Sequence, residues 1–210
     1  MTDIPDTRYI RDLLFERFTE KFHRFMPTHY GYFVAGGIFP RLYHNLPIRD
    51  VDLFATSNRN FQEIKELLMN TNGLEYLEEE GHDNLAKFSC PLGEFQLDLV
   101  NSPRRQERSP YTLIDKFDFT ISRVFMERNA GGFNINALNE EDFKDIATRK
   151  LTFTGKLLFG TEKNNTLTRM LKYTKLGYKI TEEDYVGIGV AIHALLQKAI
   201  NEGAIGAEEI

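Results

Sequence analysis

Residues 31–56 read GYFVAGGIFPRLYHNLPIRDVDLFAT, and this stretch decides the fold. The apolar run 32–35 ends at Gly36 and Gly37, which is typical of a strand that enters a tight turn. Residues 50–56 alternate charged and apolar side chains, as a half-buried strand does, so Asp50 and Asp52 project from the same face. The stretch therefore predicts two strands, linked through a glycine turn, that carry a pair of carboxylates.

A third aspartate, Asp98, lies in the strand-like segment 95–100, FQLDLV. Carboxylates held side by side repel each other, but a divalent cation reverses that balance, because Mg²⁺ takes hard oxygen ligands from a few carboxylates and substrate phosphates. A D-x-D pair alone is weak evidence, since solvent-facing strand positions often carry acids. With Asp98 on a neighbouring strand, Asp50 and Asp52 would complete a site for two metal ions.

The glycine turn strengthens this interpretation. Twelve residues separate Gly37 from Asp50. Glycines at such a turn let backbone N–H groups approach a triphosphate without interference from a Cβ atom. An ordinary tight turn accounts for the two glycines equally well when they are considered without the aspartates.

Composition excludes several other classes of protein. The chain has 210 residues, a formal charge of −5, 41% hydrophobic and 27% charged residues, which is typical of a globular domain. No apolar stretch approaches the roughly 20 residues of a membrane span, and Asp3 and Asp6 stand where a signal peptide would be apolar. A single cysteine, Cys90, forms no internal disulfide, so we expect a reducing, cytoplasmic location.

The pattern of apolar residues predicts an α+β fold that becomes more helical toward the C-terminus. We expect helices at 7–26, 61–72, 119–128, 140–147, 166–176 and from Thr181 onward, and extended segments at 32–35, 50–56, 86–90, 95–100, 133–138 and 150–154. The only plausible domain boundary lies near residues 155–165.

The order of these motifs resembles a known family. VAGG, twelve residues, DVDL and then FQLDLV resemble the nucleotidyltransferase core of the polymerase β superfamily, and most of all the class II tRNA nucleotidyltransferases and bacterial poly(A) polymerases. That group has a GGxVRD turn, where this chain has GGIFPRLY with Arg41 one position later. The resemblance implies a nucleotidyltransferase head over 1–155, a mixed sheet with flanking helices, followed by a helical neck-like segment over 156–210.

Later segments follow the family in the same order. Residues 108–125, RSPYTLIDKFDFTISRVF, are similar to a family segment that ends in RRDFTINA, which implies nucleotide contacts for Lys116 and Asp118. Residues 143–155 are similar to the family's DLxxxxIRxxG stretch. Residues 166–180 are similar to its neck helix, with Arg169, Lys172 and Lys175 on basic positions.

The neck helix departs from the family in base recognition. The family reads the base of CTP or ATP with an Asp and an Arg three residues apart, and the matching positions here are Thr166 and Arg169. Threonine removes a charged acceptor from that pair, so base preference is expected to be altered or relaxed. ATP and CTP remain the favoured nucleotides.

The resemblance implies an enzyme that transfers NMP from NTP to an RNA 3′ hydroxyl, with tRNA as one acceptor. Asp50, Asp52 and Asp98 would hold two Mg²⁺ ions, and the triphosphate would be positioned by Gly36, Gly37, Arg41 and Lys116. The resembled enzymes hold tRNA with helical body and tail domains that these 210 residues do not match, so the chemistry is better supported than the acceptor. Two alternatives stay open: a nucleotidyltransferase with a small-molecule or protein acceptor, and an inert nucleotide- or partner-binding module.

Overall fold

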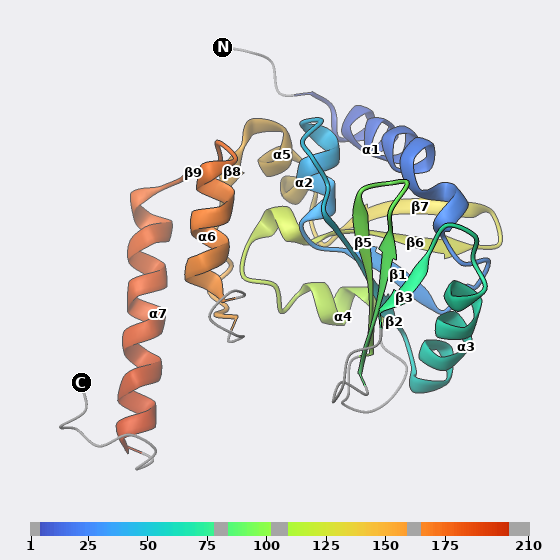
Figure 1. Cartoon of the computed structure of the whole chain (residues 1–210). Helices are drawn as coiled ribbons and strands as arrows, with labels where there is room; N and C mark the ends of the chain where they lie inside the picture. Colours follow the sequence, from blue (N-terminus) through green and yellow to red (C-terminus); the bar gives the residue numbers. More distant parts are fainter. Residues whose placement is uncertain (1–4, 78–83, 102–108, 159–164, 202–210) are drawn as a thin grey trace.

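A mixed sheet of seven strands forms the centre of the part of the chain that the structure describes (Figure 1). The structure is a computed structural model that describes residues 5–77, 84–101, 109–158 and 165–201. The strand order is β3-β4-β5-β2-β1-β6-β7. The strands are β1 Tyr32–Ala35, β2 Asp50–Ala55, β3 Glu75–Leu77, β4 Leu85–Cys90, β5 Phe95–Asn101, β6 Val124–Asn129 and β7 Gly132–Ala137.

One strand pair in this sheet is parallel. β2 runs parallel to β5, whereas the other neighbouring pairs are antiparallel. Parallel neighbours need a crossover connection, and here the connection includes a helix, α3 Asn58–Met69, followed by β3 and β4. The register of the parallel pair places Asp52 directly beside Asp98.

Helices flank the sheet, and two of them stand side by side at one end of the molecule (Figure 1). This pair consists of α6 Thr166–Lys175 and α7 Glu182–Asn201. The other helical elements are α1 Thr7–Phe22, η1 His23–Phe25, α2 Ile38–Tyr43, α4 Pro110–Ile114, η2 Thr120–Ser122 and α5 Glu140–Thr148. Two short parallel strands, β8 Lys150–Leu151 and β9 Lys179–Ile180, tie the segment after α5 to the segment after α6.

The two faces of the sheet have different roles. Val51 and Leu53 of β2, together with Leu97 and Leu99 of β5, are fully buried in the main hydrophobic core. The residues between them therefore point to the opposite face, because side chains alternate along a strand. That face carries the aspartates of both strands and, beyond them, a small apolar cluster of Phe33, Ala35, Ile114 and Phe125.

Most predicted elements are confirmed, but the helix predicted at 119–128 is wrong. Residues 124–129 form β6, a strand between β1 and β7, and Val124, Phe125 and Met126 are fully buried. A strand buried on both faces gives a continuous apolar run that periodicity cannot distinguish from a helix. The glycines after it form the β6–β7 hairpin turn rather than ending a helix. The short elements α2, β3, α4, η2 and β9 were not predicted.

No helix within the described part of the chain is long and apolar enough to cross a membrane.

Candidate active site

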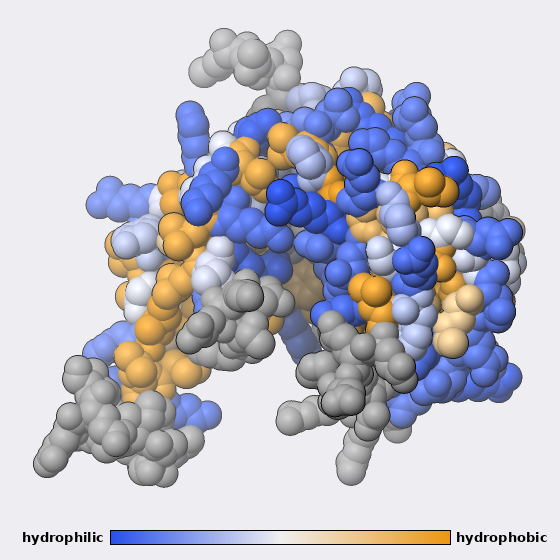
Figure 2. Space-filling view, in the orientation of Figure 1, coloured by the Kyte–Doolittle hydropathy of each residue, from blue (hydrophilic) through white to orange (hydrophobic). Residues whose placement is uncertain are grey.

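The three predicted aspartates line one cavity between the sheet and α6. The cavity has a volume of about 270 Å³. Its lining residues are Gly37, Arg41, Asp50, Asp52, Asp98, Thr168, Arg169, Lys172 and Tyr173. On the face shown in Figure 2, the surface between α6 and the sheet is hollowed and mainly hydrophilic.

The carboxylates crowd one another at the floor of this cavity. The pKa of Asp52 is raised to about 7, first by burial and then by the neighbouring charges of Asp98 and Asp50, while Arg169 and Lys172 on α6 oppose the rise. Asp98 accepts a hydrogen bond from Gln96 Nε2 at 2.5 Å, which orients one of its oxygens. The fold therefore holds acids together at an electrostatic cost.

The glycine turn lies directly against the carboxylates. Gly36 has a φ of +92°, and a Cβ atom there would lie 3.3 Å from Asp52 Oδ2. A Cβ atom on Gly37 would lie 3.3 Å from the Tyr173 hydroxyl, at the opposite wall of the cavity. The turn thus needs glycine at position 36 for its backbone conformation, and both glycines leave space beside the site.

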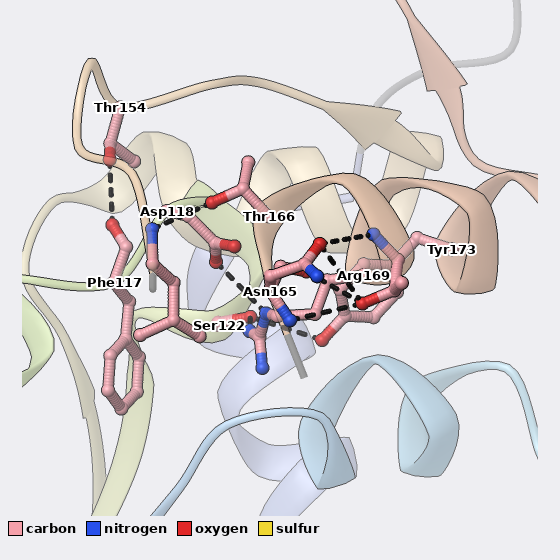
Figure 3. A network of polar contacts seen from close by, with 10 residues as sticks. Phe117, Asp118, Ser122, Thr154, Asn165, Thr166, Arg169 and Tyr173 are labelled. Carbon is pink, nitrogen blue, oxygen red and sulfur yellow. Dashed lines mark hydrogen bonds and ion pairs between the residues drawn. The ribbon is translucent and has the colours of Figure 1, made fainter. Parts of the chain in front are cut away.

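A buried polar network holds Arg169 in place (Figure 3). Arg169 donates from Nε to Asp118 Oδ1 at 3.1 Å and from Nη2 to Ser122 Oγ at 2.9 Å. The Ser122 hydroxyl in turn lies 3.1 Å from the Tyr173 hydroxyl. Burial raises the pKa of Asp118, and the Arg169 guanidinium opposes that rise. Because Asp118 is 0% exposed, its contribution to the site is made through Arg169.

The α6 helix carries the cationic wall of the cavity. Asn165 caps it by accepting a hydrogen bond from the Thr168 backbone at 3.0 Å, and the Thr168 hydroxyl accepts one from the Asn165 backbone at 3.0 Å. Arg169 and Lys172 are three residues apart and therefore share one helix face. Burial lowers the pKa of Lys172, while the nearby acids Asp50 and Asp52 raise it.

The structure brings most of the predicted site residues together, with four exceptions. Lys116 is exposed and does not line the cavity, and Asp118 lies behind Arg169. Thr166, the expected base-reading position, is 3% exposed, and its hydroxyl accepts a hydrogen bond from the Leu158 backbone at 2.7 Å. Gly36 adjoins the cavity through Asp52 without lining it.

Sequence reasoning missed Thr168 and Tyr173. Tyr173 lies four residues after Arg169, so helical periodicity places the two on one face and was a usable signal. Thr168 faces the site because it is at the third position of a helix whose start is fixed by the Asn165 cap. In the sequence, only the position of the Asn165 cap would have identified Thr168 as a residue that lines the cavity.

The donor set suits a hard divalent cation that also binds phosphate. Carboxylate oxygens are the ligands that Mg²⁺ prefers, and it commonly uses one or two of them with substrate phosphates. Within the described ranges, no three His, Cys, Asp or Glu side chains converge closely enough to hold a metal by themselves. A metal ion at the three aspartates would therefore need further ligands, such as the phosphates of a nucleotide.

Comparisons with known proteins give matches in structure only. No family model matches the chain, and no curated protein sequence matches it. A tRNA nucleotidyltransferase complexed with a primer tRNA and an ATP analogue matches 79% of this chain and 47% of its own, with 14% identity and a TM-score of 0.57. A Thermotoga maritima CCA-adding enzyme complexed with tRNA matches 91% and 44%, with 16% identity and a TM-score of 0.56.

A third match is a CCA-adding enzyme with ATP, which covers 95% of this chain and 44% of its own at 16% identity and a TM-score of 0.53. The chain therefore shares the fold of the matching part of these nucleotidyltransferase structures. Within that class, its structural neighbours are CCA-adding tRNA nucleotidyltransferases. The chain spans less than half the length of these neighbours.

Proposed function

We propose that this chain is a Mg²⁺-dependent nucleotidyltransferase that transfers NMP from NTP to the 3′ hydroxyl of an RNA and releases pyrophosphate. tRNA is the first acceptor to test, because the neighbouring structures include enzymes complexed with tRNA. The observation that carries the proposal is the cavity in which Asp50, Asp52 and Asp98 face Arg169 and Lys172.

The cavity is bipolar, and each side suits a different part of a metal-bound triphosphate. The sheet side presents three carboxylates, and the side formed by α2 and α6 presents Arg41, Arg169 and Lys172. Three acids and three bases give the lining no net formal charge. Such a surface suits a nucleotide triphosphate that arrives with its divalent cations, because the acids bind the cations and the bases bind the phosphates.

The carboxylates have separate roles in this proposal. Asp50 and Asp52 would hold two Mg²⁺ ions, and Asp98 would share one of them. When bound, these ions activate the acceptor hydroxyl and neutralise charge on the departing pyrophosphate. Arg41 and Lys172 would bind and orient the phosphates, and the Gly36–Gly37 turn would offer backbone N–H groups at close range.

Base selection is proposed to differ from that of the neighbouring enzymes. Thr166 lies outside the cavity, and two donor nitrogens of Arg169 are engaged by Asp118 and Ser122. Thr166 and Arg169 therefore do not face the cavity together, as two residues that read one base edge would. We expect this protein to discriminate among the four bases less strictly than an enzyme that accepts only C and A.

We also propose the division into a head over 1–155 and a neck-like segment over 156–210. The neck-like segment is part of the active site, because α6 supplies Thr168, Arg169, Lys172 and Tyr173 to the cavity. It also shares the main core with the head through Met170 and Tyr173. A cytoplasmic location remains part of this proposal.

A labelled-nucleotide transfer assay tests the proposed function. Each of the four α-³²P-labelled NTPs is incubated with the protein, total RNA and Mg²⁺, and the RNA, protein and small-molecule fractions are separated. We expect label in RNA that is lost with EDTA and lost in Asp52→Asn and Asp98→Asn. Asp12→Asn on α1 is the matched control, because it removes one exposed carboxylate far along the sequence from the site.

Each other outcome contradicts a named part of the proposal. Label in the protein or small-molecule fraction would replace the RNA acceptor with one of the alternatives. Wild-type turnover by Asp98→Asn would remove Asp98 from the catalytic set. Absence of label from all fractions with all four NTPs would favour an inert binding module.

A further inference from the structure

Two further cavities adjoin the candidate active site and continue from it across the surface. The first, about 660 Å³, shares Arg41, Asp50 and Lys172 with the site and adds Arg49 and Lys175. The second, about 560 Å³, shares Arg49 with the first and adds Lys21 and Arg24. Because neighbouring cavities share lining residues, the three lie next to one another in a row, hereafter the depression, that leads away from the carboxylates.

This depression is basic although the protein is acidic. Its six basic side chains, hereafter the basic track, are Lys175, Lys172, Arg41, Arg49, Arg24 and Lys21. Beyond the catalytic Asp50, the two outer cavities include one acidic lining residue, Glu94. The whole chain carries a formal charge of −5. Six cations along one path make this part of the surface positive on a molecule that is negative overall. A positive surface of this kind is what the binding of a polyanion requires.

The fold fixes the middle of the basic track. Arg41 Nη1 donates to the Pro47 carbonyl at 2.6 Å, which ties α2 to the loop that precedes β2. The Arg49 carbonyl accepts a hydrogen bond from the Gln96 backbone at 2.6 Å, so Arg49 is anchored where β2 meets β5. At the far end, the Arg24 guanidinium lies 4.5 Å from the centre of the Phe25 ring. The cations are thus carried on packed elements.

We propose that the basic track binds the phosphates of a single-stranded RNA segment whose 3′ end reaches Asp98. This inference rests on the proposed function and names the part of the protein that holds its acceptor. A small acceptor would need a single cavity, whereas the cations extend through three adjoining ones. Lysine and arginine side chains that bind phosphates recognise the charge and spacing of the backbone and not the bases. The basic track would therefore bind RNA with little dependence on its sequence.

The experiment compares two double variants that remove the same charge. Lys21→Gln/Arg24→Gln removes the far end of the track, outside the catalytic cavity. Lys150→Gln/Lys179→Gln is the matched control, because these exposed lysines are partners on β8 and β9 and line none of the three cavities. Binding of a fluorescent single-stranded RNA of about 12 nucleotides, within the usual footprint of such grooves, is measured across a salt series.

We expect the track variant to bind RNA less tightly and with a weaker salt dependence. Two lost phosphate contacts lower the slope of log K against log salt by about 1.4, which is roughly a 25-fold loss at 0.1 M salt. In the transfer assay, KM for RNA should rise by a similar factor while KM for NTP stays constant. The control variant should match the wild type in slope and KM.

The outcomes separate this inference from the proposed function. If the wild type transfers label to RNA and the track variant has the slope and KM of the control, the track is not the acceptor site. If the wild type transfers label to no acceptor, the proposed function fails, and the salt series still decides whether the track binds RNA. If the track variant loses affinity for a polyglutamate peptide and not for RNA, the partner is an acidic protein and the inference is overturned.

Discussion

Replacing Asp52 by asparagine should make the protein more stable while it removes activity. The pKa of Asp52 rises from 3.8 to about 7 on folding, which corresponds to roughly 4 kcal/mol at about 1.4 kcal/mol per pKa unit. Asp52 lines a cavity that is open to solvent and is only partly buried, so solvent screening reduces this figure, and we expect a gain of about 1–3 kcal/mol for the variant at pH 8.

The sign of the effect follows from proton linkage. A carboxyl with a raised pKa in the folded state binds protons more tightly there than in the unfolded chain, so its ionisation destabilises the fold. The penalty is absent below the unfolded pKa, near pH 4, grows as the pH rises, and is complete above about pH 7. Asparagine carries no charge at any of these pH values, so the advantage of Asp52→Asn must grow between pH 5 and pH 8.

Urea denaturation of the wild type and Asp52→Asn, in EDTA at pH 5, 6, 7 and 8, measures this difference. Subtracting the two free energies of unfolding cancels the acids far from Asp52, and the relief of Asp50 and Asp98 from its charge adds to the difference with the same sign. Asp12→Asn serves as the control and should show a difference that does not change with pH. A variant that is no more stable than the wild type at pH 8, or an advantage that is constant from pH 5 to pH 8, would refute the reasoning.

Two further substitutions test the surroundings of the carboxylates. Gly36→Ala should lose about 1–2 kcal/mol of stability and most of the activity, because the φ of Gly36 is +92° and a Cβ atom there would press on Asp52. Gly132→Ala is the control, because Gly132 has a φ of +117° but a Cβ atom there would meet no atom within 4 Å. This control should lose a similar amount of stability and keep its activity. Arg169→Leu should lower the free energy of unfolding by about 3–5 kcal/mol, because it leaves Asp118 buried without its partner, and adding Asp118→Asn should recover part of that loss in urea denaturation. Equal activity of the two alanine variants, or no recovery in the double variant, would contradict these assignments.

The strand that carries Asp50 and Asp52, and the turn before it, were predictable because their signals are local. Alternation in DVDLFAT placed Asp50 and Asp52 on one face, and the turn after Ala35 was marked by Gly36 and Gly37. The motif order around them was sufficient to indicate the fold class. Each of these patterns spans only a few consecutive residues.

Other features depended on contacts that no local pattern contains. Residues 119–128 were predicted as a helix, but pairing with β1 and β7 on its two sides makes 124–129 the strand β6. The role of Asp118 also lay beyond the motif, since its burial behind Arg169 is set by how α6 packs on the head. Likewise, Thr166 matched a base-reading position in sequence but its hydroxyl accepts from the Leu158 backbone.

The parallel pairing of β2 with β5 has a consequence for how the molecule matures. Asp52 and Asp98 are 46 positions apart in the sequence, and they become neighbours only when the crossover has closed. A nascent polypeptide that has not yet emerged as far as residue 101 has Asp50 and Asp52 but cannot yet place Asp98 beside them. If the pair binds Mg²⁺ as proposed, the cation would draw the folding equilibrium toward the folded state by mass action and would offset the repulsion between the two carboxylates.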